Sequence, residues 1–203
     1  GSDQQIARAT ALWLKIEANI GLSRLDAAQQ SLPEAIALVR AAAPETKLHG
    51  DLMRSQGAVA GIVGKASEAL TSYLEAHRIF RKAGEKRSEA LALQDIGQIY
   101  FEAGDYDRML SYADQAQEIY HDDPGIALSA NNNRGEAYRT LRRWADAEKA
   151  FGAALANARA LESPMLEMRV LSNLAQVQIE MGQLGKATRN IQSAERLGRF
   201  AEA

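Results

Sequence analysis

The sequence predicts an all-α protein, a solenoid of about five antiparallel helical hairpins in one continuous domain. Three observations favour this fold class. The chain of 203 residues is similar to itself at a period near 40 residues, which is typical of stacked repeats. Val, Ile and Thr never alternate in short runs bounded by turns, as strands require. Alanine is abundant and only 6% of the residues are aromatic, a composition suited to closely packed helices.

The repeat becomes visible when the chain is shifted along itself. The best-defined copy contains Ile96, Gly97, Tyr100, Gly104, Tyr106, Met109, Ala113 and Ala116. The next copy, 38 residues later, contains Arg134, Gly135, Tyr138, Arg142, Trp144, Ala147, Phe151 and Ala154. Further copies lie about 40 residues before the first of these and after the second. Because small and large positions coincide in four copies, each copy is expected to be one hairpin of the same shape.

The first copy is degenerate, as terminal repeats often are because one face meets water. Its matching residues are Ile16, Ser23, Leu25, Ala28, Leu32 and Ala35. Pro33 interrupts the second helix of this copy, between Ser31 and Glu34. This arrangement predicts either a kink or a new helix start near residue 33.

Helix boundaries are marked by capping residues. Asp123-Pro124 and Ser163-Pro164 each resemble an N-cap followed by proline at the first helical position. Gly64, Gly104 and Gly182 suit the left-handed conformation that ends a helix. Gly1 and Ser2 resemble the remnant of a cleaved tag, so the predicted domain covers residues 3–203. We expect helices at 4–20 paired with 24–42, 46–62 with 66–82, 86–102 with 106–121, 124–140 with 144–160, and 164–181 with 184–198.

The copies resemble the tetratricopeptide repeat family. Its pattern pairs Leu-Gly with a Tyr three residues on, followed by Gly-x-Tyr and then by Ala, an aromatic residue and Ala. The resemblance covers nearly the whole chain, although Gln178 replaces the tyrosine and Arg142 replaces the turn glycine. It implies a right-handed superhelix in which a small residue lets the two helices of a hairpin approach closely and a tyrosine or tryptophan fills the gap beside them.

The period near 40 is longer than the 34 residues usual for this family. It resembles the subgroup found in kinesin light chains, in bacterial peptide-sensing regulators and in the sensory parts of some bacterial signalling enzymes. The chain also resembles helical regions that precede diguanylate cyclase domains. The resemblance therefore implies two alternatives: a scaffold that binds a protein or an extended peptide, or the sensory segment of a larger bacterial signalling protein.

Charge and composition argue against several classes of function. The chain has 24 Lys and Arg against 26 Asp and Glu, without a block of like charges, so the electrostatic signature of nucleic-acid or anionic-membrane binding is missing. No apolar run approaches the length of about 20 residues that spans a bilayer, so we expect a soluble segment. The absence of cysteine excludes disulfides and leaves cytoplasm and bacterial periplasm both open.

Catalytic and cofactor motifs are also missing, so we expect a protein that is not an enzyme and holds no metal or cofactor. His49, His77 and His121 belong to different repeats and have no second ligand at metal-binding spacing. We expect them at turns or helix ends, in surface or capping roles. Asp122 and Asp123 are adjacent carboxylates, but capping of the following helix explains them. No nucleophile with a base and an orienting group can be identified.

The resemblance implies that the first helix of each hairpin lines a concave groove. It assigns to this groove the residues Arg54, Ser55, Gln94, Asp95, Gln98, Glu102, Asn132, Asn133, Glu136, Arg139, Arg169, Asn173, Gln176 and Glu180. Asn and Gln each offer a donor and an acceptor, so such a groove can pair with the backbone of an extended peptide. Asn131, Asn132 and Asn133 are poor helix formers. Their run inside a predicted helix indicates either a functional role or simple tolerance of Asn on an exposed helix face. The residue set that clamps a terminal carboxylate in the family's chaperone-binding members is not matched.

A third hypothesis is self-association. The last predicted helix is not followed by the polar capping helix that such stacks use, and its apolar flank predicts a homodimer through the terminal repeat.

Overall fold

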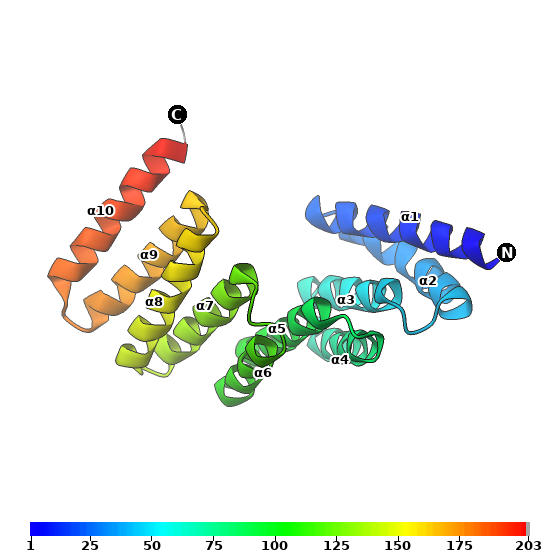
Figure 1. Cartoon of the computed structure of the whole chain (residues 1–203), viewed down its shortest axis with the longest axis horizontal. Coiled ribbons are helices and arrows are strands. Elements are labelled where there is room, and N and C mark those ends of the chain that lie inside the picture. The colour runs from blue at the N-terminus through cyan, green and yellow to red at the C-terminus, as the bar shows by residue number, and fades with distance from the viewer. Residues whose placement is uncertain (202–203) are drawn as a thin grey trace. The chain divides into compact units, whose positions relative to one another are not determined.

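The computed structural model describes residues 1–201, and all regular secondary structure in this range is α-helical. The chain forms two compact units, Gly1–Ala103 (unit 1) and Gly104–Ala203 (unit 2). Within each unit, consecutive helices run side by side in antiparallel order (Figure 1). The prediction of an all-α helical repeat is therefore confirmed, while the extent of the single predicted domain stays a prediction.

Unit 1 holds five helices, and each first helix of a hairpin contacts the next one along the chain. The helices are α1 (Ser2–Gly21), α2 (Leu25–Ala42), α3 (Lys47–Ile62), α4 (Ala66–Ala83) and α5 (Lys86–Glu102). α1 pairs with α2 and α3 pairs with α4, while α3 also contacts α1 and α5. The fully buried side chains of Ile16, Leu52 and Phe80 lie in its core.

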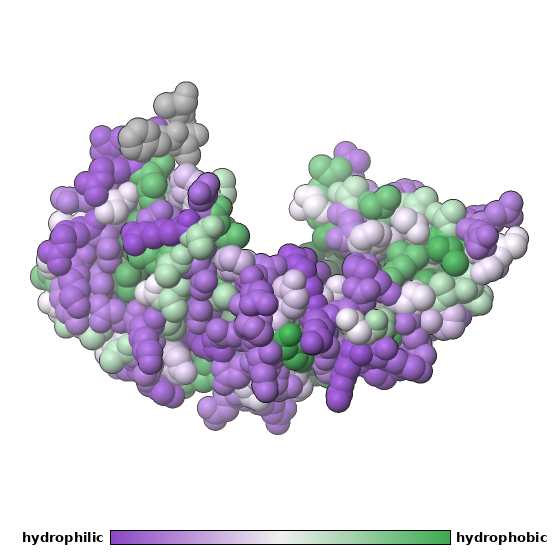
Figure 2. Space-filling model, viewed as in Figure 1, coloured by the Kyte–Doolittle hydropathy of each residue, from purple (hydrophilic) through white to green (hydrophobic). Residues whose placement is uncertain are grey.

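Unit 2 repeats the same plan with two complete hairpins. Its helices are α6 (Tyr106–Ile119), α7 (Pro124–Thr140), α8 (Trp144–Ala160), α9 (Pro164–Glu180) and α10 (Leu184–Ala201). α7 pairs with α8 and α9 pairs with α10, while α8 packs on α9. Phe151, Val170 and Leu171 are buried in its core. In each unit, patches of hydrophobic surface interrupt a mainly hydrophilic one (Figure 2).

The helix boundaries agree with the sequence prediction within three residues, and of the two alternatives expected at Pro33, a kink or a new helix start, the new start is wrong. α2 runs without interruption from Leu25 to Ala42, so no new helix starts at Pro33. Proline removes one backbone donor and crowds one carbonyl, but Leu32 and Ile36 on either side of it are buried. Their packing in the core holds the helix together across this position.

The predicted caps and turns are observed. Asp123 accepts hydrogen bonds from the backbone N–H groups of Gly125 and Ile126, and Ser163 accepts one from Leu166. Gly64 and Gly182 have φ angles of 78° and 69° in the turns that follow α3 and α9. Arg142, in the equivalent turn after α7, has a φ of 57°. This is the left-handed region that a residue with a side chain occupies at a cost of about 1–2 kcal/mol.

Glycines set the distance between the helices of two hairpins, and Gly50 beside the Phe80 ring, Gly57 and Gly135 approach most closely. A Cβ atom placed on Gly57 would lie 2.6 Å from the ring of Tyr73, and one placed on Gly135 would lie 2.6 Å from the ring of Phe151. The close approach is thus as predicted, but in these two hairpins the ring that fills the contact comes from the second helix. In unit 2 it is a phenylalanine, and not the predicted tyrosine or tryptophan.

Candidate functional site

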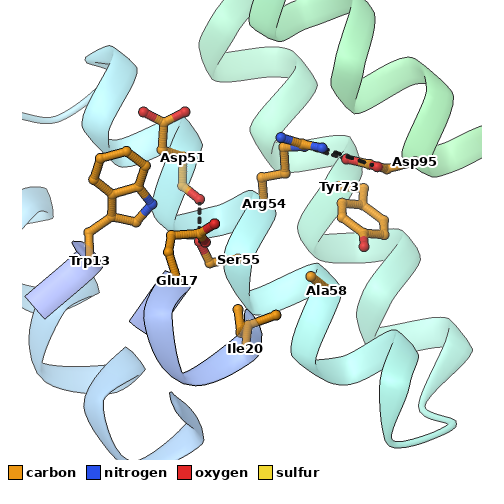
Figure 3. Close-up of a pocket in the computed structure, with 9 residues that line it drawn as sticks. All are labelled: Trp13, Glu17, Ile20, Asp51, Arg54, Ser55, Ala58, Tyr73 and Asp95. Atoms are coloured by element: carbon orange, nitrogen blue, oxygen red, sulfur yellow. Dashed lines mark hydrogen bonds and ion pairs between the residues drawn. The ribbon is translucent and has the colours of Figure 1, made fainter. Parts of the chain in front are cut away.

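The first helices of unit 1 carry a polar surface with a pocket in it. α1, α3 and α5 each present one face toward this surface, and Tyr73 reaches it from α4 (Figure 3). The pocket has a volume of about 120 Å³. Its lining residues are Trp13, Glu17, Ile20, Asp51, Arg54, Ser55, Ala58, Tyr73 and Asp95. We call it the unit 1 pocket.

Arg54 and Asp95 form an ion pair at one side of the unit 1 pocket. The Arg54 Nε atom donates to Asp95 Oδ2 at 2.5 Å, and its Nη2 atom lies 3.4 Å from Oδ1. Burial raises the pKa of the Asp95 carboxyl above its ordinary value, while the Arg54 guanidinium opposes that change. The pair joins α3 to α5 and keeps the guanidinium turned toward Asp95 (Figure 3).

A second interaction crosses from α3 to α1. The Ser55 hydroxyl is buried and lies 2.6 Å from Glu17 Oε1 and 2.9 Å from the Asp51 carbonyl. A hydroxyl has a single proton, so it donates to one of these oxygens at a time. Burial raises the pKa of Asp51, and its ion pair with Lys47 at 2.7 Å acts in the opposite direction.

A second cavity adjoins the unit 1 pocket and shares three of its lining residues. It has a volume of about 240 Å³ and is lined by Ala58, Gly61, Ile62, Tyr73, Asp95, Gln98, Ile99 and Glu102. The Gln98 amide donates to Glu102 at 2.9 Å on the exposed side of α5. Of the predicted groove residues of unit 1, Arg54, Asp95 and Gln98 thus lie on one connected surface, and Gln94 lies half-buried on the same helix as Asp95.

The predicted residues of unit 2 form two small groups. Asn173 Nδ2 on α9 donates to Asn132 Oδ1 on α7 at 3.1 Å. Glu136 and Arg139 pair with each other on α7, with 2.7 Å between Arg139 Nη2 and Glu136 Oε2. The Asn133 side chain is half-buried and makes no hydrogen bond within the described part of the chain. Its amide is therefore available to a partner.

The remaining predicted residues lie apart from these groups. Arg169 is exposed on α9. Gln176 is also exposed and lines a different cavity, of about 370 Å³, between α9 and α10. Much of that cavity is apolar, since it is formed with Met168, Ala175, Ile179, Ile191 and Ala194. Gln176 thus lines this cavity, although it lies only three residues after Asn173 on α9.

Six of the nine residues that line the unit 1 pocket were not predicted from the sequence, among them Trp13, Glu17 and Tyr73. Trp13 and Glu17 belong to the degenerate first copy, in which the groove positions could not be assigned. Tyr73 belongs to a second helix, which the family pattern does not assign to the groove. The spacing of 38 residues between Glu17 and Ser55 is close to the repeat period, and that signal could have identified Glu17.

His77 differs from the prediction, whereas His49 lies at a helix end as expected but is buried. His49 is 5% exposed near the start of α3, and its Nδ1 atom accepts from the Glu45 backbone N–H at 3.3 Å. His49 Nε2 is buried without a hydrogen-bond partner in the structure, and burial lowers the pKa of this side chain. His77 lies inside α4, 3.3 Å from Glu89. Only His121, which is 72% exposed, has the predicted surface position.

Within residues 1–201, no group of three potential metal ligands comes together. None of the helices in this range combines the length and the hydropathy of a membrane span.

Residues 48–122 match the family model of the tetratricopeptide repeat. No curated protein matches the sequence. The fold is similar to several solved structures at low sequence identity. One is BtubC (BKLC) from P. vanneervenii, with 17% identity, a TM-score of 0.72, and coverage of 100% of this chain and 93% of that one.

Two further structures are also similar in fold. One is a signal transduction ATPase with numerous domains, with a tetratricopeptide repeat sensor, from Pyrococcus horikoshii. It shows 18% identity, a TM-score of 0.84, and coverage of 98% of this chain and 31% of that one. The other is a Rap protein complexed with competence and sporulation factor. It shows 13% identity, a TM-score of 0.75, and coverage of 96% of this chain and 64% of that one.

Proposed function

We propose that this chain, in which residues 48–122 match the family model of the tetratricopeptide repeat, is a non-catalytic scaffold that binds a protein or an extended peptide. The binding surface is the polar face of the first helices in each unit. In unit 1 it contains Arg54, Asp95 and Gln98 beside two connected cavities. In unit 2 it contains Asn132, Asn133 and Asn173.

The observation that carries this proposal is that polar side chains recur about one repeat apart on the first helices, and that in unit 1 they line two open cavities. A half-buried amide without a partner, such as Asn133, leaves hydrogen-bonding capacity unused, and an extended peptide backbone supplies both the missing donor and the missing acceptor. The similarity in fold to a Rap protein complexed with competence and sporulation factor supports a peptide as the partner.

The test is selection of binders from a library of random linear peptides displayed on phage, with the whole chain as bait. We expect enriched peptides whose affinity falls by about tenfold, or roughly 1.4 kcal/mol, when Asn133→Ala and Asn173→Ala are combined. Asn157→Ala is the matched control, because Asn157 lies on the second helix α8 and donates only to its own helix at Ala153.

A failure to enrich any peptide would contradict the proposal. So would affinities that fall as much with the Asn157 control as with the double variant. Thermal unfolding of all variants separates lost binding from lost structure.

A second candidate function is the sensory segment of a larger signalling protein. The observation in its favour is that 98% of this chain is similar in fold to 31% of a signal transduction ATPase with a tetratricopeptide repeat sensor. An output domain such as a diguanylate cyclase belongs to this alternative. The gene sequence beyond residue 203 tests it, because an open reading frame without an output domain would contradict the idea.

Self-association is a third candidate, favoured by the apolar cavity between α9 and α10. Ile179 and Ile191 line it and are 49% and 41% exposed, and Leu184 nearby on α10 is 63% exposed. Exposed apolar area of this kind marks interaction sites. Light scattering over a range of concentrations tests this candidate, and a strict monomer at the highest concentration would rule it out.

A further inference from the structure

The unit 1 pocket combines an open cavity, an aromatic wall and a carboxylate without a basic partner. Trp13 and Glu17 are four residues apart on α1, so their side chains share one face of that helix. Both line the cavity together with Ser55 from α3. Figure 3 shows Trp13 and Glu17 on the side of the pocket away from Asp95.

The charged groups around the pocket are paired unevenly. Arg54 is engaged with Asp95, and Asp51 is engaged with Lys47. Within the described residues, Glu17 has no Lys, Arg or His partner, and its hydrogen bond is to the Ser55 hydroxyl. Arg54 therefore acts on Glu17 only through space, while its ion pair is with Asp95, so the Glu17 carboxylate has no ion-pair partner of its own.

Ser55 orients this carboxylate toward the pocket. The buried hydroxyl lies 2.6 Å from Glu17 Oε1, which leaves the second carboxylate oxygen open to a guest. An ammonium or guanidinium group bound there would make a charge-assisted hydrogen bond, and the nearby indole of Trp13 would add a cation–π interaction. An anionic guest would face Glu17, Asp51 and Asp95 together.

The volume of the pocket limits what can enter. About 120 Å³ is room for the end of one side chain but not for a folded element. The long, unbranched stems of Lys and Arg deliver a charge into such a space and bury their methylene groups against apolar walls. Ile20, Ala58 and the Trp13 ring supply those walls.

We propose that the unit 1 pocket receives a Lys or Arg side chain of the bound peptide, held between the Glu17 carboxylate and the Trp13 ring. This inference rests on the proposed peptide-binding function and specifies the chemistry of its partner. The pocket of unit 1 then selects a basic residue, whereas Asn132 and Asn173 of unit 2 bind neutral polar groups.

The experiment compares two selections from the same random peptide library, one with the wild-type chain and one with Glu17→Gln. The glutamine keeps an oxygen for Ser55 and removes only the charge, so the helix and the pocket shape are retained. We expect a Lys or Arg at one position of the wild-type binders and no such preference with Glu17→Gln. Asp26→Asn, an exposed carboxylate on α2 outside the pocket, is the charge-matched control and should keep the preference.

Titration calorimetry on one selected peptide then measures the effect. Its affinity should fall at least tenfold on Glu17→Gln, and equally when its basic residue is replaced by methionine. The two changes together should lower the affinity little more than either change alone, because both remove the same contact. Trp13→Leu should weaken the basic peptide and leave the methionine peptide nearly unchanged.

The outcomes separate this inference from the proposed function. Peptides enriched without a basic position, or with the same basic preference on Glu17→Gln, would overturn the inference and leave peptide binding intact. Additive effects in the calorimetric comparison would overturn it as well. No enriched peptide at all would overturn the proposed function and the inference with it.

Discussion

Arg54 with Asp95 in unit 1 and Asn132 with Asn173 in unit 2 occupy the same pair of repeat positions. In both units the first partner lies three residues before the small residue of one repeat (Gly57 or Gly135), the second lies two residues before that of the next repeat (Gly97 or Ala175), and the two partners are 41 residues apart. Unit 1 fills these positions with an ion pair and unit 2 fills them with two amides. The repeat period thus determines which positions meet, while the residue types determine the strength of the contact and the guest that can bind beside it.

The largest expected effect tests what the two units share. Gly57→Ala and Gly135→Ala should each lower the free energy of unfolding by about 2 kcal/mol, because the new methyl group would overlap an aromatic ring that is buried in the hairpin. Chemical denaturation monitored by circular dichroism measures both.

Gly61→Ala and Gly152→Ala are the matched controls, since a Cβ atom on Gly61 meets nothing closer than 3.9 Å and one on Gly152 meets nothing within 4 Å. Replacing glycine inside a helix without a clash should stabilise it by about 0.5–1 kcal/mol. If Gly57→Ala were as harmless as Gly61→Ala, the close approach of α3 and α4 would be wrong.

The next effect tests the difference between the units. Asp95→Ala should destabilise the chain by about 1–2 kcal/mol, less than for a fully buried pair, because the Arg54 and Asp95 side chains are 38% and 24% exposed and water screens them. Asn173→Ala removes a neutral hydrogen bond and should cost about 0.5–1 kcal/mol.

The dependence on salt concentration distinguishes the ion pair from the amide pair more clearly than the size of the two destabilisations does. At about 1 M NaCl the screening length falls to about 3 Å, so the effect of Asp95→Ala should shrink while that of Asn173→Ala stays the same. Equal responses to salt in denaturation experiments would remove the chemical distinction between the units.

A smaller effect concerns the equivalent turns after α3 and α7. Arg142→Gly should stabilise the chain by about 0.5–1 kcal/mol, since glycine adopts a positive φ without strain. Gly64→Ala should destabilise it by about 1 kcal/mol for the same reason. Melting temperatures of the two variants should move in opposite directions, and a shared direction would show that the turns are not equivalent.

The smallest effect is a pH dependence that comes from His49 in unit 1. Burial lowers the pKa of His49 below its ordinary value of 6.5, so the unfolded chain takes up this proton more readily than the folded one. The contribution to stability is complete above pH 6.5 and is lost as the pH falls below it. His49→Gln should remove this part of the pH dependence and His121→Gln, at an exposed site, should leave it unchanged. Identical pH profiles for wild type and His49→Gln would contradict the assignment.

The sequence predicted the fold better than the site, and particular residues show why. Helix ends depend on local chemistry, such as the caps at Asp123 and Ser163, and these were identified. The continuity of α2 across Pro33 depends on burial of Leu32 and Ile36, which a local rule does not include. Arg142 in a glycine position was noticed as a departure from the pattern, but only the φ angle shows that the turn keeps its conformation.

The candidate site was predicted where the repeat pattern was strong. Arg54 and Asp95 were both assigned to the groove, yet their mutual contact follows only from the packing of α3 on α5. Trp13 and Glu17 lie in the copy that matches the pattern least, so no groove position pointed to them. Gln176 has a groove position by register, but the packing of α10 gives it different neighbours. Whether these residues bind a partner stays a prediction.

Hydrogen–deuterium exchange of the whole chain, with and without a selected peptide, tests the central claim most directly. The claim is that the partner binds on the first helices of the hairpins. Slower exchange should therefore appear in α1, α3 and α5 of unit 1 and in α7 and α9 of unit 2, while α4, α8 and α10 exchange as before. Protection confined to the second helices would contradict the account.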